Sequence, residues 1–205
     1  MPSSFVIEVV GLACVRGERA LFHELSFRLP SGGVLSVEGP NGAGKTSLLR
    51  MIAGFIPPAA GSVAVISSDG RVDDPEERGK LMGWLGHHDA AKSQLTPTEM
   101  LRSYAGLYGN LADVAASLDR VGLTRLSELP CQYLSAGQKK RLALARLLIC
   151  GRAIWLMDEP LAALDEAGKR LAAELIGEHG ASGGATIAAT HEPLGVASDQ
   201  VRLGP

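Results

Sequence analysis

A glycine-rich segment at residues 39–46 has the spacing of an anion-binding loop. Its letters, GPNGAGKT, fit the pattern GxxxxGK[ST], with an apolar run at 34–37 before it and a helical pattern at 48–52 after it. Glycines let the backbone curl so that successive N–H groups converge on an anion, and the following helix adds the positive end of its dipole. We therefore expect a nucleotide to be bound by Gly39, Pro40, Asn41, Gly42, Ala43, Gly44, Lys45, Thr46 and Ser47.

Two side chains of this segment have separate roles in the expected site. Lys45 is expected to reach the β- and γ-phosphates, and Thr46 to offer its hydroxyl to Mg²⁺. The alternative is an ordinary glycine-rich turn, but a chance match in a chain of this composition is on the order of one per cent. The strand and helix patterns on either side favour the phosphate loop.

Two adjacent carboxylates follow another apolar run. Residues 153–157, AIWLM, predict a buried strand that delivers Asp158 and Glu159 to its carboxyl end, where ligands of α/β sheets bind. We expect Asp158 to hold Mg²⁺ and Glu159 to orient or deprotonate an attacking water. A strand that simply ends in solvated acids is the alternative, and the phosphate loop upstream favours the catalytic reading.

Two further positions could contact phosphate. Ser135 and Gln138 suffice as a helix cap. The cations at 139–141 would then lie at a helix N-terminus, where the helix dipole disfavours positive charge, and a bound anion would offset that unfavourable interaction. His191 follows the apolar run 185–190 and would lie at the end of that strand. A lone histidine is more often structural, and both interpretations stay open from the residues alone.

The elements that position these residues alternate between strand and helix patterns. Apolar runs predict strands, and capping boxes predict helices, one of them opened by Thr96 and Glu99 and another by Ser135 and Gln138. Strand and helix alternation predicts an α/β fold with a helical insertion near 95–135 in a single domain, 1–205. The expected strands are 5–10, 25–29, 34–38, 62–66, 81–85, 153–157 and 185–190; the expected helices are 97–108, 111–121 and 136–150; and the expected loops are 57–61, 69–80 and 181–184.

Composition excludes several classes of protein. With 46% apolar and 20% charged residues, the chain is expected to fold and not to be disordered. A net charge of −2 and 4% aromatic residues argue against a nucleic-acid partner. Cys14, Cys131 and Cys150 have no disulfide or zinc spacing, which indicates a reducing compartment and ordinary packing. Charged residues interrupt every apolar stretch before it reaches the length of a membrane span.

Taken in order, GPNGAGKT, LSAGQ, IWLMDEP, LAALD and TH at 190–191 have the approximate spacing of ATP-binding cassette (ABC) ATPases, and the chain resembles that superfamily over its whole length. The resemblance implies a P-loop NTPase fold with a mostly parallel core sheet flanked by helices, an N-terminal antiparallel β part, and ATP and Mg²⁺ as ligands. It implies that Ser135, Gly137 and Gln138 bind the γ-phosphate of ATP held by a second copy. It places Asp165 across that dimer interface and makes His191 a γ-phosphate sensor.

A narrower resemblance is to the cytochrome c maturation ATPases (CcmA), the haem exporter ATP-binding family. It is carried by LSAGQKKRLALARLL at 134–148, THEPL at 190–194, LGH at 85–87 before LTPTEML, and an end at 205, beyond which we expect no regulatory extension. It implies integral membrane subunits as partners, a haem chaperone as an indirect one, and a peripheral position on the cytoplasmic side of the bacterial inner membrane.

Two positions depart from ABC ATPases in general. The aromatic residue that usually stacks on adenine is Arg16, whose guanidinium can still lie flat on a base. The glutamine expected after the strand at 81–85 aligns with His88, which could sense Mg²⁺ or merely fill the loop and meet the membrane subunit. His87 and His88 are adjacent on an extended segment and point to opposite sides, so that a shared metal or haem site is disfavoured.

The predicted function is therefore ATP hydrolysis that drives a membrane complex for haem handling in c-type cytochrome biogenesis. One alternative is the ATPase of a drug, lipid or polysaccharide exporter, which genomic neighbours would distinguish. Another is an ABC protein that acts on DNA or ribosomes, which ordinarily needs a second cassette, a coiled-coil insertion or a basic arm. A GTP switch is disfavoured, because the chain has no [NT]KxD motif.

Overall fold

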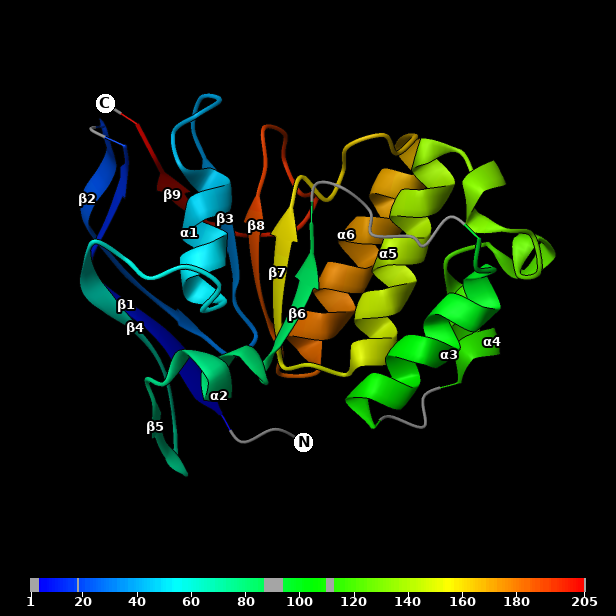
Figure 1. The fold of residues 1–205 in the computed structure, drawn as a ribbon, viewed down its shortest axis with the longest axis horizontal. Helices are drawn as coiled ribbons and strands as arrows, with labels where there is room; N and C mark the ends of the chain where they lie inside the picture. The colour runs from blue at the N-terminus through cyan, green and yellow to red at the C-terminus, as the bar shows by residue number, and fades with distance from the viewer. Residues whose placement is uncertain (1–3, 18, 87–93, 110–112, 205) are drawn as a thin grey trace.

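The computed structural model describes residues 4–17, 19–86, 94–109 and 113–204, which form two sheets and two groups of helices (Figure 1). A five-stranded sheet lies at the centre, in the order β6-β7-β8-β3-β9, and each neighbouring pair is parallel. All residues of β7 and β8 are buried, which explains their continuous apolar sequences. The strands are β3 (Val34–Glu38), β6 (Met82–Leu85), β7 (Ile154–Asp158), β8 (Ala185–Ala189) and β9 (Asp199–Arg202).

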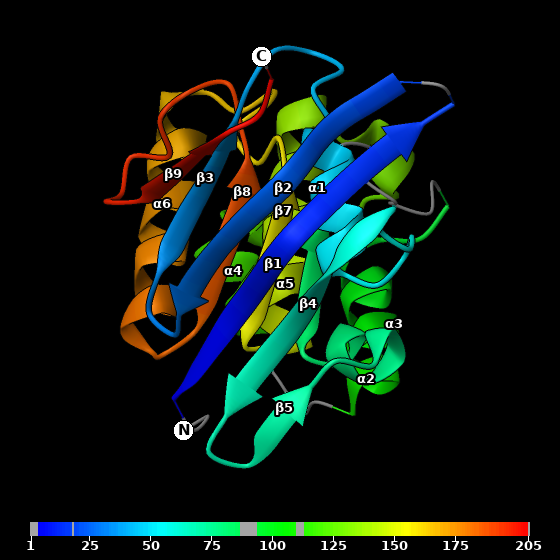
Figure 2. The same ribbon diagram turned by 90° about the vertical axis from the view of Figure 1, so that its left-hand side faces the viewer.

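A second, antiparallel sheet faces the first (Figure 2). Its order is β2-β1-β4-β5, with β1 at Phe5–Arg16, β2 at Arg19–Pro30, β4 at Ala60–Ser67 and β5 at Gly70–Val72. Alternate residues at the start of β1 are buried, as expected for a sheet with one face on the core. This sheet confirms the expected N-terminal antiparallel part.

The helix α1 (Lys45–Ile52) lies between the two sheets and packs on β7 and β8. Its apolar side chains join those of both sheets in one buried cluster, which includes Leu48, Leu49 and Ile52 from the helix and Leu156 and Ile187 from the parallel sheet. The first turn of α1 is thereby held at the carboxyl ends of the parallel strands.

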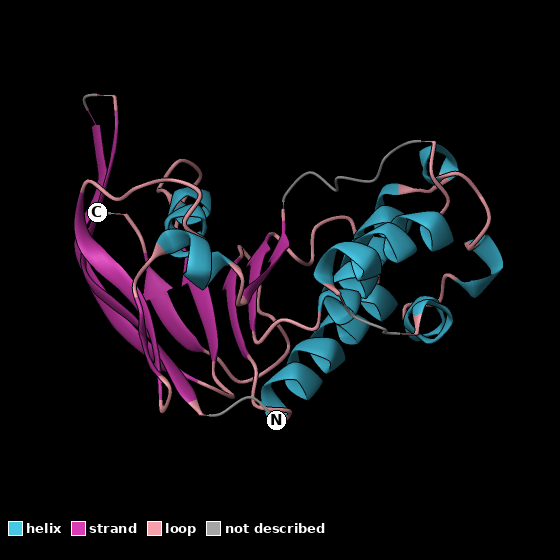
Figure 3. Cartoon of the chain, turned by 60° about the horizontal axis from the view of Figure 1, so that its bottom comes forward, coloured by secondary structure: helices cyan, strands magenta, loops and turns pink. Residues whose placement is uncertain are grey.

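Most other helices gather on the opposite face of the parallel sheet (Figure 3). They are α3 (Pro97–Tyr108), α4 (Val114–Arg120), α5 (Ala136–Cys150) and α6 (Glu166–Ala181), and their apolar residues form a second buried cluster with β6, β7 and β8. Short 3₁₀ turns at Thr124–Leu126 and Cys131–Tyr133 precede α5. None of the helices within the described ranges is both long and apolar enough to cross a lipid bilayer.

The predicted helices 97–108 and 136–150 are confirmed at both ends, and the one expected at 111–121 is Val114–Arg120 in the described residues. The loop expected at 69–80 is wrong, because it contains β5 and the short helix α2 (Pro75–Gly79). Pairing with β4 defines β5, and the Asp74 carboxylate caps α2 by accepting bonds from two backbone N–H groups.

The first two strands are longer than predicted, and β9, like β5, lies outside the predicted strands. The strands expected at 5–10 and 25–29 are the inner parts of β1 and β2, which continue into a long hairpin with irregular register. No strand was expected at Asp199–Arg202, where three of the four residues are exposed. Its strand conformation depends on pairing with β3, a tertiary contact that leaves no apolar pattern in the sequence.

Candidate active site

The phosphate loop joins β3 to α1 and has the backbone conformation that its glycines allow. Gly39 has a φ of 144°, and a Cβ atom there would overlap the carbonyl oxygen of Leu203. Gly44 caps the N-terminus of α1 with a φ of 102°, where a larger residue would be strained. The two glycines let the chain turn sharply into the helix, which directs the first backbone N–H groups of α1 toward the site.

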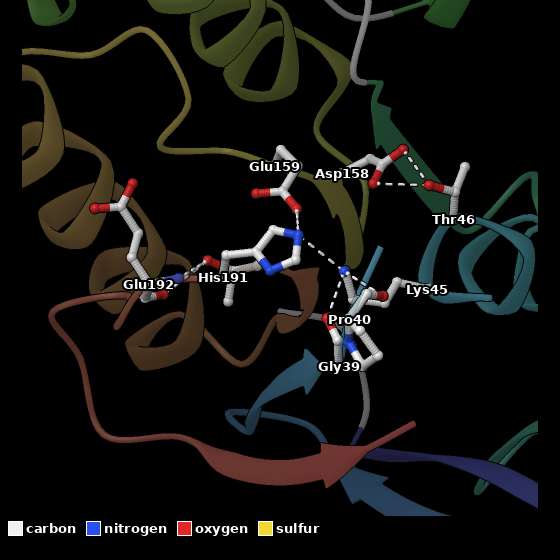
Figure 4. Close-up of polar contacts among 9 residues, drawn as sticks. Gly39, Pro40, Lys45, Thr46, Asp158, Glu159, His191 and Glu192 are labelled. Carbon is white, nitrogen blue, oxygen red and sulfur yellow. Dashed lines mark hydrogen bonds and ion pairs between the residues drawn. The ribbon is translucent and has the colours of Figure 1, made fainter. Parts of the chain in front are cut away.

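Lys45 is held by the loop that carries it. Its ammonium group donates to the carbonyl oxygens of Gly39, at 2.8 Å, and Pro40, at 3.4 Å, and to Nε2 of His191 at 2.9 Å (Figure 4). The residue is 8% exposed. The cation therefore lies between the phosphate loop and the end of β8, 146 residues away in the chain.

Thr46 and Asp158 form the second contact between distant segments. The Thr46 hydroxyl lies 2.9 Å and 3.1 Å from the two carboxylate oxygens of Asp158, which is 4% exposed. A hydroxyl and a buried carboxylate side by side are hard oxygen ligands of the kind that Mg²⁺ prefers. The two residues fit the predicted magnesium site.

Glu159 and His191 complete the cluster. Glu159 has a φ of 50°, an uncommon conformation for a residue other than glycine, and its backbone N–H donates to the carbonyl oxygen of Ala189 at 2.9 Å. The sharp turn separates its side chain from that of Asp158, and its Oε1 atom lies 3.3 Å from Nε2 of His191. In Figure 4 the His191 ring stands between the Glu159 carboxylate and the Lys45 ammonium group.

These side chains border a cavity of about 340 Å³, which we call the phosphate cavity. Gly39, Pro40 and Ala43 are not among its lining residues; the carbonyl oxygens of Gly39 and Pro40 accept from Lys45, and the Ala43 N–H donates to the Pro40 carbonyl oxygen at 3.2 Å. Arg16 is not among the lining residues; it is exposed near the tip of the β1–β2 hairpin, opposite Arg19. The cavity is lined by Leu21, Asn41, Gly42, Gly44, Lys45, Thr46, Ser47, Asp158, Glu159 and His191.

The other predicted site residues border a separate hollow of about 520 Å³, the signature hollow. Ser135 and Gln138 form the predicted capping box of α5: the Ser135 hydroxyl accepts from the Gln138 N–H, and the Gln138 side chain accepts from the Ser135 N–H. The hollow is lined by Gly122, Leu123, Ser135, Ala136, Gly137, Gln138, Arg141, Ala163 and Asp165. Among the residues that the structure describes, it shares no lining residue with the phosphate cavity.

Within the signature hollow, the Asp165 side chain makes hydrogen bonds to both α5 and α6. Its carboxylate caps α6 by accepting from the Gly168 N–H at 2.8 Å, and it also accepts from Arg141 at 3.0 Å. The Gly168 N–H, and secondly Arg141, hold the pKa of Asp165 below its usual value. One of the three cations near the start of α5 is thus already balanced by an acid of the same chain.

Sequence reasoning missed one residue that lines the cavity and one buried arginine at the far end of α1, and it cannot be tested at a third position. Leu21 lines the phosphate cavity, and the expected strand at 25–29 stopped short of it. Arg78, in the region predicted as loop, is 4% exposed and donates to the carbonyl oxygens of Met51 and Ile52 at the end of α1. Burial lowers the pKa of Arg78, and no motif marked it. His88 lies outside the described residues.

Comparison with known proteins identifies the family. The sequence profile of the ABC transporter family matches residues 22–162. The cytochrome c biogenesis ATP-binding export protein CcmA of Rhodopseudomonas palustris (strain BisB5) is 47% identical over 197 residues, which cover 95% of this chain and 96% of that protein. The protein of the same name from Bradyrhizobium diazoefficiens is 47% identical over 93% of this chain and 94% of that protein.

A solved structure supports the fold. It is described as an ABC transporter ATP-binding protein from Pyrococcus furiosus, has a TM-score of 0.81 and 23% sequence identity, and covers 97% of both chains. The likeness confirms the expected fold class, a mixed α/β ATPase with a parallel core sheet and an antiparallel part. Together with the ordered motifs, these findings show that the chain belongs to the ABC transporter ATP-binding family and, within it, to the CcmA family of cytochrome c biogenesis.

Proposed function

We propose that two copies of this chain hydrolyse Mg·ATP to drive an integral membrane complex that handles haem during c-type cytochrome biogenesis. One observation carries the catalytic part of the proposal. Lys45, Thr46, Asp158, Glu159 and His191 come from three separate segments and meet in one cavity at the carboxyl ends of β3, β7 and β8.

Each residue of the cluster has a task in phosphoryl transfer. Thr46 and Asp158 would hold Mg²⁺, which supplies charge neutralisation on the phosphates when bound. The loop N–H groups and Lys45 hold the β- and γ-phosphates. Glu159 orients a water and accepts its proton as the water oxygen attacks the γ-phosphorus. The bond from the γ-phosphorus to the bridging oxygen breaks, giving ADP and inorganic phosphate.

His191 is the proposed sensor of the γ-phosphate. Its Nε2 atom faces both the Lys45 ammonium group, a donor, and the Glu159 carboxylate, an acceptor. A neutral imidazole nitrogen either donates or accepts, so that Nε2 satisfies one of these neighbours at a time. When the γ-phosphate binds Lys45, His191 is released to donate to the phosphate or to Glu159.

A second copy of the chain is proposed to supply further contacts to the γ-phosphate. Ser135 and Gln138, with the α5 N-terminus and the close approach that Gly137 allows, are proposed to bind the γ-phosphate held by the partner's phosphate loop. Asp165 then lies at the dimer interface. The separation of the two hollows on one chain supports this arrangement, because no described residue lines both of them.

The proposed membrane partners and the role in haem handling are based on the relatives of this chain. Those relatives are named as ATP-binding export proteins of cytochrome c biogenesis. We propose that this chain binds integral membrane subunits at the cytoplasmic face of a bacterial inner membrane, with a haem chaperone acting downstream.

Deletion of the gene in its host tests the proposal. Holocytochrome c, measured by haem staining and absorbance, should disappear and return with the parent gene but not with Glu159→Gln. Affinity purification of the tagged chain from detergent-solubilised membranes should recover integral membrane subunits. Normal cytochrome c in the deletion strain would contradict the haem role and would favour another exporter.

A further inference from the structure

The turn that carries His191 is fixed on its N-terminal side by buried contacts. Thr190 is 2% exposed, and its N–H donates to the carbonyl oxygen of Val37 at 3.1 Å. Its hydroxyl accepts from the Glu192 N–H at 3.1 Å and donates to the Glu192 carbonyl oxygen at 2.7 Å. These bonds shape the backbone of the turn around His191.

On the C-terminal side, the side chain of Glu192 fixes the same turn to α6. Its Oε2 atom lies 2.5 Å from the Lys169 ammonium group. In Figure 4 Glu192 extends to the side of His191 away from Lys45. The bond to Glu192 is the main reason that the pKa of Lys169 is raised.

The Lys169–Glu192 ion pair is too exposed to contribute much to the stability of the fold. The side chains of Lys169 and Glu192 are 31% and 42% exposed, and ion pairs this exposed contribute little to folding stability. Its geometry is more informative than its energy, because it connects the turn beside the catalytic cluster to the first turn of α6.

That helix begins in the signature hollow. Asp165 caps α6, and the Lys169 backbone N–H donates to the Asp165 carbonyl oxygen at 2.8 Å. The path from Asp165 through Lys169 and Glu192 to His191 is therefore continuous within one chain. A displacement of α6 at the hollow would be transmitted to the turn by this ion pair.

We propose that Lys169 and Glu192 are positioning residues, which hold the His191 turn against the start of α6 so that the imidazole stays aligned with Lys45 and Glu159. The inference rests on the proposed function. Nε2 of His191 lies 2.9 Å from Lys45 Nζ and 3.3 Å from Glu159 Oε1, so that a shift of about 1 Å would disrupt both contacts. Losing the pair should therefore slow hydrolysis without weakening ATP binding.

A double-mutant cycle on the full chain tests this inference. Lys169→Met and Glu192→Gln should each lower kcat roughly tenfold, with KM for ATP, the binding of a fluorescent ATP analogue and Tm close to those of the parent. The double variant should lose no more than either single one, because both remove the same interaction. The charge swap, Lys169→Glu with Glu192→Lys, should recover part of the lost kcat.

Glu166→Gln is the matched control. Glu166 is on the same helix, 3.9 Å from Lys169 and 82% exposed, and its loss leaves the Lys169–Glu192 pair intact. Unchanged kcat in the single variants, additive losses in the double variant, or losses equal to that of Glu166→Gln would overturn the inference. So would equal losses of ATP binding and Tm. Glu159→Gln, measured in parallel, tests the proposed hydrolysis itself, so that the two claims can fail separately.

Discussion

The phosphate cavity and the signature hollow use their polar side chains differently. In the phosphate cavity, partners far apart in the chain bind one another, as Lys45 binds His191 and Thr46 binds Asp158. In the signature hollow, Ser135 and Gln138 bind each other within one helical turn, and a pair between distant residues, Arg141 with Asp165, lies at the surface, with the Asp165 side chain 71% exposed.

The phosphate cavity is thus a cluster of side chains that bind one another, whereas the signature hollow is a surface open to solvent. The fold of a single chain brings the groups of the phosphate cavity together. The signature hollow is a helix N-terminus with satisfied caps and a solvent-facing surface, and under the proposed function it becomes part of a catalytic site only when a second copy covers it. On this account, the first region determines ATP binding and chemistry, and the second determines whether chemistry proceeds.

Glu159→Gln should have the largest effect and should act only on the phosphate cavity. The amide cannot accept the proton of the attacking water, so kcat should fall by roughly 10²- to 10⁴-fold while ATP affinity is retained. Because hydrolysis would no longer open the dimer, ATP and Mg²⁺ should shift the variant to a dimer in size-exclusion chromatography. Phosphate release at the parent rate would remove Glu159 from the assigned role.

Gly137→Ala should change the structure of the signature hollow and leave the phosphate cavity unchanged, so that the contributions of the two regions can be measured separately. A Cβ atom at Gly137 would lie 2.8 Å from the carbonyl oxygen of Ala163, so the segment before Asp165 must move. We expect kcat to fall about tenfold with unchanged ATP affinity.

Gly106→Ala on α3 is the control, because a Cβ there meets no atom of the described residues within 4 Å. The comparison of regions loses its basis if both glycine variants behave alike, or if Gly137→Ala weakens ATP binding as much as it slows hydrolysis.

His179→Phe should change neither region and should alter stability alone. The His179 ring stacks on Trp155 at 3.9 Å, and burial lowers the pKa of His179 to about 4, against about 6.5 in the unfolded chain. The unfolded state therefore takes up a proton first as the pH falls below 6.5, and the parent should lose about 1–2 kcal/mol of folding free energy between pH 7.5 and pH 5 through this group.

Urea denaturation at the two pH values measures this effect. Phenylalanine keeps the stacking but does not titrate, so the fall in stability with acid should be smaller by that amount in His179→Phe, and kcat at pH 7.5 should match that of the parent. An identical pH dependence in both proteins would show that His179 does not contribute.

The sequence predicted the features that depend on local chemistry. The phosphate loop is a backbone conformation encoded by its own glycines, and the starts of α3 and α5 are fixed by capping boxes four residues long. The buried strand β7 is visible as a continuous apolar run, and its carboxyl end locates Asp158 and Glu159.

Features that depend on tertiary pairing could not be predicted. The strand β9 exists because β3 offers it a free edge, and β5 because it pairs with β4. In the sequence, Arg78 belongs to a charged stretch that is typical of a surface loop. Its burial depends on hydrogen bonds to the carbonyl oxygens of Ile52 and Val63, which are tertiary contacts. The Lys169–Glu192 pair joins residues 23 positions apart, and neither has a spacing that indicates the other.

Mixing two inactive variants tests most directly whether the two half-sites belong to different chains. Lys45→Ala destroys the phosphate cavity and Ser135→Arg blocks the signature hollow, so each protein alone should be inactive. A heterodimer would contain one intact composite site, and an equimolar mixture that pairs at random should recover about a quarter of the parent ATPase activity. Hydrolysis at the parent rate by Ser135→Arg alone, or no gain on mixing, would contradict the account.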